Sequence, residues 1–220
     1  MAKVIIFGIA ENSSLAHYYL NHDTEHEVVA FTVNRDYLPD DLIFEGLPVL
    51  PFEEVERSHP PTEFSMFAPL AASRMNRFRE QVYTEIKAKN YQLISYVSSK
   101  ATVFPGAIIG DNCFILEDNT IQPYVKIGNN VVLWSGNHIG HHGEIRDHVY
   151  FTSHVVLSGR CLVEPYCYFA VNCTIRDGLH IAEGTFVTMA SSVTRDTEPW
   201  GVYKGSPAQK TKISSQDYYK

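Results

Sequence analysis

Residues 103–145 read VFPGAIIGDNCFILEDNTIQPYVKIGNNVVLWSGNHIGHHGEI, and every sixth residue of this segment is apolar. The same spacing continues without interruption as far as Val193. Sixteen positions obey it: Val103, Ile109, Ile115, Ile121, Ile127, Leu133, Ile139, Ile145, Phe151, Leu157, Val163, Phe169, Ile175, Ile181, Val187 and Val193. Because 45% of all residues are hydrophobic, chance would produce such a run about 3 times in a million for one frame. The period is therefore a structural property of the chain.

A period of six fits neither an α-helix nor an alternating strand. It is typical of a chain that makes a short strand, turns and repeats, so that three repeats complete one coil around an apolar interior. Residues eighteen apart should then stack, and the run should make about five coils. The residue two positions before each buried one is usually small. We expect Gly110, Gly128 and Gly140, which follow buried residues, to supply the dihedral angles of the turns.

The first hundred residues alternate between strand and helix patterns. Predicted strands cover residues 3–8, 27–33, 47–50, 63–69 and 92–97, and predicted helices cover 13–21, 52–58 and 73–89. This order predicts a small Rossmann-like parallel sheet within an α/β domain at residues 1–98. The coil would occupy residues 99–198, and a C-terminal segment would follow at 199–220.

Ligand is expected at the carboxyl ends of the strands, where the loops at residues 8–13, 33–36 and 71–77 would meet. The first loop fails as a dinucleotide fingerprint because it keeps one glycine, and Glu11 would repel an inward phosphate. Backbone N–H groups near Asn12 and Ser13 could bind an anion, or either side chain could cap the helix. The sequence leaves both alternatives open.

The composition restricts the classes of partner. The chain has 25 acidic and 18 basic residues, a net charge of −7 and a pI near 5.8, which disfavours nucleic acid and anionic membrane surfaces. It has no run of eighteen apolar residues, and the stretch at residues 4–7 is too short for a signal peptide, so we expect a cytoplasmic protein. We expect the four cysteines to be buried free thiols.

Histidines gather in residues 137–148. His138, His141, His142 and His148 would stack on Val156, Gly159, Arg160 and Tyr166, so no column of metal ligands forms and we predict no metal site. A metal-dependent hydratase with ligands from neighbouring subunits is one alternative. The stacked positions fit acyl transfer better than metal binding, because an imidazole of pKa about 6.5 can take the proton of an attacking amine or hydroxyl. Gly159 could offer a free backbone N–H to the oxyanion beside His141.

The segment from Ile127 to Gly136, together with His141 and Gly159, resembles nucleotide-sugar acetyltransferases of the bacillosamine N-acetyltransferase and sialic acid O-acetyltransferase family. The resemblance covers nearly the whole chain, since those enzymes carry a small α/β domain before a left-handed parallel β-helix. It implies that His141 is the catalytic base and that Gly159 is the oxyanion donor. It also implies that the nucleotide lies in the N-terminal domain and that acetyl-CoA lies between two subunits of a homotrimer.

The resemblance further implies coenzyme contacts. These fall on Tyr150, Val171 and Met189, and on Pro207 and Ala208 of a glycine-x-proline-alanine segment. The nearby Lys204 and Lys210 could bind the phosphates of the coenzyme, and a solvated basic tail would explain them equally well. The family usually has an acidic residue after the catalytic histidine, where this chain has His142. His142 is therefore included among the catalytic candidates, and Glu144, Asp147 or a neighbouring subunit could orient His141.

The expected activity is acetyl-CoA-dependent N-acetylation of a nucleotide-linked amino sugar, of the dideoxy-amino-hexose type, for surface polysaccharide such as lipopolysaccharide. The substrate would be held by Ala10, Glu11, Asn12, Asn34, Arg35, Ser73, Trp134 and His138. Trp134 could instead cap a corner of the coil. The alternatives are a sugar O-acetyltransferase of the same fold and a non-catalytic nucleotide-sugar-binding scaffold.

Overall fold

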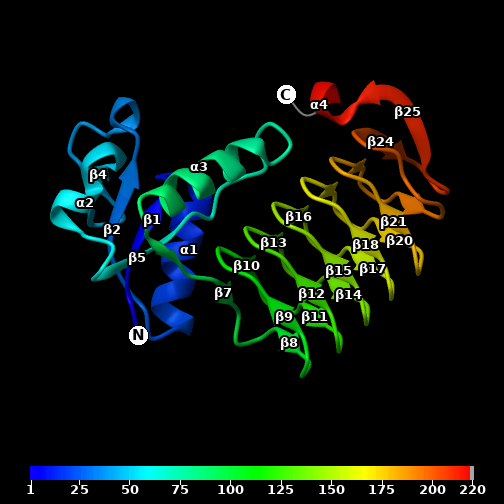
Figure 1. Cartoon of the computed structure of the whole chain (residues 1–220), viewed down its shortest axis with the longest axis horizontal. Helices are drawn as coiled ribbons and strands as arrows, with labels where there is room; N and C mark the ends of the chain where they lie inside the picture. Colours follow the sequence, from blue (N-terminus) through cyan, green and yellow to red (C-terminus); the bar gives the residue numbers. More distant parts are fainter. Residues whose placement is uncertain (219–220) are drawn as a thin grey trace. The chain divides into compact units, whose positions relative to one another are not determined.

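A computed structural model describes residues 1–218 of the chain, which divides into two compact units. The first unit comprises residues 1–71 and 81–95. The second comprises residues 72–80 and the chain from Tyr96 onward, so a short segment of the expected N-terminal domain groups with the coil. Figure 1 shows the helices of the first unit and the regular rungs of the second.

The first unit is a six-stranded sheet in the order β3-β4-β2-β1-β5-β6, parallel except for the β3–β4 hairpin. The elements are β1 (Lys3–Phe7), α1 (Glu11–Asp23), β2 (Glu27–Val33), η1 (Arg35–Tyr37), β3 (Ile43–Phe44), β4 (Leu47–Pro51), η2 (Phe52–Glu54), α2 (Val55–Ser58), β5 (Phe64–Phe67) and β6 (Gln92–Leu93). The central strand β1 is an apolar run because its residues are buried on both faces. The predicted parallel α/β sheet is confirmed.

Two predicted elements of this half differ from the structure. The strand expected at residues 92–97 is two strands, and only β6 belongs to the first sheet, because β7 (Tyr96–Val97) pairs with the coil. The helix expected at residues 73–89 is α3 (Arg77–Ala88). Three consecutive residues before it, Arg74, Met75 and Asn76, have positive φ angles of 52°, 49° and 65°. This left-handed turn buries Met75 and Asn76, which a continuous helix would not do.

The second unit is a left-handed parallel β-helix with two-residue strands every six residues. Its strands are β8 (Thr102–Val103), β9 (Ile108–Ile109), β10 (Phe114–Ile115), β11 (Thr120–Ile121), β12 (Lys126–Ile127), β13 (Val132–Leu133), β14 (His138–Ile139), β15 (Glu144–Ile145), β16 (Tyr150–Phe151), β17 (Val156–Leu157), β18 (Leu162–Val163), β19 (Tyr168–Phe169), β20 (Thr174–Ile175), β21 (His180–Ile181), β22 (Phe186–Val187) and β23 (Ser192–Val193). Each strand pairs with the strand eighteen residues on, as Ile121 does with Ile139. The predicted stacking is therefore confirmed.

The apolar sixth residues fill the interior of this coil from Ile115 to Val193. Val103 is 38% exposed and Ile109 is only partly buried, because β8 and β9 lie at the ends of their sheets and the first coil is covered on one side only. All four cysteines are buried and free, as predicted. At the other end, β24 (Gly201–Lys204) extends one sheet, and β25 (Gln209–Ser214) and α4 (Ser215–Tyr218) follow.

The turns of the coil follow a second period of six. Residues with φ between 52° and 87° are Gly106, Asn112, Asp118, Tyr124, Asn130, Gly136, His142, His148, His154, Arg160, Tyr166, Asn172, Gly178, Gly184 and Ala190. Gly110, Gly128 and Gly140 are not among them, so the expectation that they supply the turn dihedrals is wrong. A Cβ at Gly140 would collide with the backbone of the next coil, so this glycine serves close approach. Asn, Asp and His tolerate the left-handed region better than most residues, which explains part of the histidine cluster.

One outer face of the coil is covered by residues 72–80. Its outward residues are Tyr96, Phe114, Val132, Tyr150, Tyr168 and Phe186, spaced by eighteen. The Arg79 guanidinium lies 5.4 Å from the Tyr150 ring and donates to the Asn130 carbonyl at 2.5 Å. Asn76 donates to the Tyr166 carbonyl at 3.1 Å. An apolar period of eighteen is therefore the sequence signal of this buried face.

A column of turn residues runs beside this face. Asn130 accepts from the Asn112 amide at 2.9 Å, and its own amide lies 2.9 Å from His148 Nδ1. The amide must donate there, so Nδ1 carries no proton and His148 is neutral. Burial lowers the pKa of His148 below its usual value of 6.5.

We expect His148→Asn to reduce the loss of stability on acidification. A histidine whose pKa is lowered by folding contributes stability that is present above the unfolded pKa and lost as pH falls through the folded pKa. Urea unfolding between pH 8 and pH 5 would measure this, with a shallower fall for the variant. His154→Asn is the matched control, because His154 is an exposed residue at an equivalent left-handed corner. Equal pH profiles for His148→Asn and the unmodified protein would contradict this account.

Candidate functional site

His141 lies at the corner between β14 and β15 and is half-buried. Its backbone N–H donates to the Gln122 side chain at 2.9 Å, one coil earlier. Its Nδ1 lies 3.2 Å from Nδ1 of His142. The second ring nitrogen, Nε2, therefore remains available to a bound ligand.

Gly159 lies directly against this imidazole. A Cβ built on Gly159 would lie 2.9 Å from both Cε1 and Nε2 of His141, so the ring occupies the space that a side chain would fill. The Gly159 N–H donates no hydrogen bond to any residue in the range 1–218. Gly140, which the sequence analysis did not select for this site, has no side chain to collide with that nitrogen. The structure thus brings an imidazole, a bare α-carbon and a free backbone donor together.

His142 is the residue that contacts Nδ1 of His141. It adopts a left-handed corner conformation, with φ of 56°, and its ring lies beside that of His141. Its ring centroid lies 4.8 Å from that of Tyr124, with the two rings tilted by 42°. The two carboxylates expected as alternatives are engaged elsewhere. Glu144 pairs with Arg146 at 3.4 Å, and Asp147 accepts the Asn129 N–H at 2.7 Å.

Tyr150 and Trp134 lie away from this corner. Tyr150 is 5% exposed, stacks on Tyr168 and accepts a hydrogen bond from the Trp134 indole at 2.6 Å. Residues 72–80 cover this face, so little of the Tyr150 side chain is accessible to a coenzyme. Trp134 belongs to the same hydrogen-bonded pair. This favours the alternative that Trp134 caps a corner of the coil over the alternative that it lines an acceptor pocket. His138 is the outward residue of β14, three positions before His141.

The other residues expected at the coenzyme occupy a different edge of the coil. Val171 is 40% exposed and Met189 is 72% exposed, and both lie at the corner after the strands β19 and β22. His141 lies at the corner after β14, one edge away. The residues expected at the base and those expected at the coenzyme therefore lie on two different edges of the coil.

The C-terminal candidates lie near the end of the coil. The Ala208 N–H donates to the Ser192 carbonyl at 2.6 Å, which holds the segment containing Pro207 against β23. Lys204 is exposed. Lys210 pairs with Glu198, so it reaches an anion only by leaving that carboxylate.

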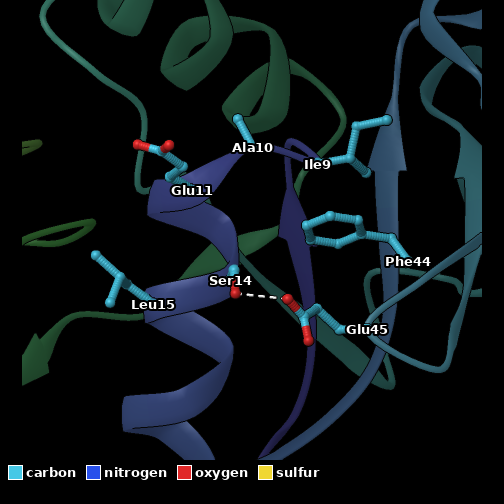
Figure 2. A pocket seen from close by; sticks show the side chains of 7 residues that line it. All are labelled: Ile9, Ala10, Glu11, Ser14, Leu15, Phe44 and Glu45. Atoms are coloured by element: carbon cyan, nitrogen blue, oxygen red, sulfur yellow. Dashed lines mark hydrogen bonds between the residues drawn. The ribbon is translucent and has the colours of Figure 1, made fainter.

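The first unit contains a cavity of about 680 Å³ between the start of α1 and the β3–β4 hairpin (Figure 2). Its lining comprises Ile9, Ala10, Glu11, Ser14, Leu15, Phe44 and Glu45. Ala10 and Glu11 were expected there, whereas Phe44 and Glu45 were not. Asn12, Asn34 and Arg35 do not line it, and Ser73 belongs to the other unit.

The start of α1 has no side-chain cap, since its N-cap residue is Ala10, so the alternative that Asn12 or Ser13 caps it is wrong. Arg35 is engaged with Glu54 at 2.5 Å. Within residues 1–218, no three His, Cys, Asp or Glu side chains come close enough to hold a metal ion. None of the helices in this range is long and apolar enough to span a bilayer.

Residues 106–141 match the family model of the bacterial transferase hexapeptide, six repeats. The hexapeptide coil and the preceding α/β unit together share the fold of solved acetyltransferases. The acetyltransferase domain of PglB from Neisseria gonorrhoeae has a TM-score of 0.84 and 18% identity, covering 96% of this chain and 100% of that one.

Two further comparisons extend this result. PerB from Caulobacter crescentus, solved with CoA and GDP-perosamine, has a TM-score of 0.83 and 18% identity over 96% of this chain and 98% of that one. An acyl-[acyl-carrier-protein]–UDP-N-acetylglucosamine O-acyltransferase from Sinorhizobium fredii is 23% identical to this chain over 107 residues, which make up 46% of this chain. The match spans 40% of the length of that relative.

Proposed function

We propose that this protein is an acetyl-CoA-dependent N-acetyltransferase that acts on a nucleotide-linked amino sugar. The observation that carries the proposal is the His141 imidazole lying against Gly159, whose N–H is free among residues 1–218. Proteins with the same whole fold support the choice of substrates, because PerB is solved with CoA and GDP-perosamine and the PglB domain with acetyl coenzyme A. The proposed sugar is of the dideoxy-amino-hexose type, for surface polysaccharide.

In the proposed reaction the sugar amine, in its neutral form, attacks the thioester carbonyl of acetyl-CoA. His141 Nε2 takes the proton that the nitrogen loses as the C–N bond forms. The Gly159 N–H donates to the oxyanion of the tetrahedral intermediate. When the C–S bond breaks, the imidazolium returns the proton to the departing thiolate, giving amide and CoA. The chain then needs no covalent intermediate.

His142 is a positioning residue in this mechanism. A neutral His142 accepts the proton of His141 Nδ1 across the 3.2 Å contact, which fixes the tautomer and leaves the Nε2 lone pair facing the substrate. The left-handed corner holds His142 in place for this purpose. An acidic residue at the same position would accept the same proton.

We expect His142→Ala to lower kcat about 10-fold with little change in KM, because the orienting partner of the base is lost. His142→Asp should recover most of the rate, since a carboxylate accepts the same N–H. Steady-state kinetics over pH 6–9 would measure both, with the apparent pKa of kcat higher in the Asp variant. A rate that is unchanged in His142→Ala would refute the positioning role.

We propose a homotrimer in which the corner of His141 meets the edge carrying Val171 and Met189 of a second chain. The adjacent corners of one coil cannot close on each other, so the cleft for acetyl-CoA needs both copies. The nucleotide would occupy the cavity of the α/β unit, at the uncapped start of α1. A cytoplasmic location is part of the same proposal and agrees with four free cysteines.

The test is incubation of the protein with acetyl-CoA and UDP-, GDP- and dTDP-linked amino sugars, with release of free thiol as the readout. Thiol release that depends on an amino sugar, with acetylated sugar seen by mass spectrometry, would support the proposal. Release with hydroxyl acceptors alone would establish O-acetylation instead. Binding of a nucleotide sugar without any turnover would establish a scaffold.

A further inference from the structure

We propose that Glu45 reads the base of the bound nucleotide and that the cavity of the α/β unit selects guanine. This rests on the proposed function only in that the substrate is a nucleotide sugar.

Glu45 occupies the tip of the β3–β4 hairpin. Phe44 pairs with Leu47, so Glu45 and Gly46 form the two-residue turn, with φ angles of 51° and 77°. The side chain reaches across to α1, where the Ser14 hydroxyl donates to Oε1 at 2.5 Å (Figure 2). Oε2 accepts no hydrogen bond from residues 1–218, and the carboxylate interacts electrostatically with His17. The carboxylate is therefore held by a hydrogen bond to one oxygen, which keeps one lone pair, while the other oxygen accepts none.

The surroundings favour a planar ligand that donates hydrogen bonds. The apolar part of the lining comes from Ile9, Ala10, Leu15 and Phe44, and Phe44 is braced edge-on against Phe31 at 4.9 Å. The lining contains two carboxylates and no basic side chain. In Figure 2, Glu11 extends from the side of α1 that lies away from Phe44, whereas the Glu45 carboxylate lies near the Phe44 ring and is directed toward Ser14. Phosphate groups would be repelled from this side of the cavity, whereas N–H groups would be attracted.

Among the common bases, guanine matches a carboxylate best. Its N1–H and 2-amino groups are adjacent donors, and they can meet the two oxygens of one carboxylate as a charge-assisted pair. Uracil and thymine present one N–H between two carbonyl oxygens, which would oppose the carboxylate. Adenine offers its amino group beside an acceptor nitrogen. A carboxylate at this position therefore disfavours the other bases, either because one hydrogen bond is lost or because a carbonyl oxygen of the base repels it.

Calorimetric titration of the full-length protein with GDP, IDP and UDP tests the proposal, since IDP lacks only the 2-amino group. We expect GDP to bind about 10-fold more tightly than IDP, and UDP to bind more weakly still. Glu45→Gln should bring the GDP to IDP ratio to within about 2-fold, because the amide replaces one acceptor with a donor. Glu63→Gln is the control, an exposed carboxylate of the same unit outside this lining, and should keep the ratio.

Equal binding of GDP and IDP, tighter binding of UDP, or an unchanged ratio in Glu45→Gln would each overturn the proposal. A thermal melt would show that the variant, altered at an exposed turn, remains folded. The two proposals fail separately. Guanine selectivity without acetyl transfer would overturn the enzymatic function alone, whereas acetyl transfer to a uridine-linked sugar with no guanine preference would overturn the role of Glu45 alone.

Discussion

Replacement of His141 by alanine should lower kcat/KM for acetyl transfer by about 10²- to 10⁴-fold, the usual contribution of a general base. The three atoms nearest to a Cβ at Gly159 all belong to this ring, and the free N–H of Gly159 remains after the substitution. The residual rate should therefore reflect binding and oxyanion stabilisation. Thiol release with saturating acetyl-CoA and the preferred amino sugar would measure the effect.

Two controls make this result specific. CoA binding and oligomeric state should be unchanged in His141→Ala, because the side chain is half-buried at a corner and carries no part of the interior. His180→Ala removes an exposed imidazole from the outward side of β21, a residue outside the proposed site, and should keep the rate within a few-fold. A His141→Ala protein that turns over as fast as the unmodified one would refute the role of His141 as base.

Replacement of Gly159 by alanine should lower kcat about 10²-fold, the scale expected for a misplacement of about 1 Å. The new Cβ would lie 2.9 Å from Cε1 and Nε2 of His141, so the imidazole must move away from its position over the glycine. Gly159 does not have a positive φ, so alanine should be tolerated by the backbone. Steady-state kinetics would show the loss mainly in kcat.

Gly178→Asn is the control for an added side chain at the same edge. No atom lies within 4 Å of a Cβ at Gly178, and asparagine tolerates its φ of 69°. This variant should retain activity and stability. If Gly159→Ala were as active as Gly178→Asn, the close contact between ring and glycine would have no catalytic meaning.

The coil was predictable because its contacts repeat with the sequence. An apolar residue every six positions determines the inward side chains, and the spacing of eighteen places His141 on Gly159 before any coordinates are known. The alternation of strands and helices likewise predicts the parallel sheet of the first unit. These features depend on neighbours at fixed separations along the chain.

The geometry of the site could not be predicted from this spacing alone. His142 lies beside His141 at a left-handed corner, a conformation that no expectation had assigned to it. Tyr150 had been expected at the coenzyme, yet the eighteen-residue apolar period on its face, had it been read, would have predicted burial. Phe44 and Glu45 join the cavity through the β3–β4 hairpin, which was not predicted.

The sequence by itself determined the coil, its interior, the α/β unit and the pairing of His141 with Gly159, because each follows from a local pattern or a constant period. Only the tertiary structure decided what covers the outer face of the coil and what lines the cavity. Arg79 reaches Asn130 across 51 residues, and Glu45 reaches Ser14 across 31. Such contacts depend on where a non-repeating segment docks, which is set by the packing of the whole chain and leaves no period in the sequence.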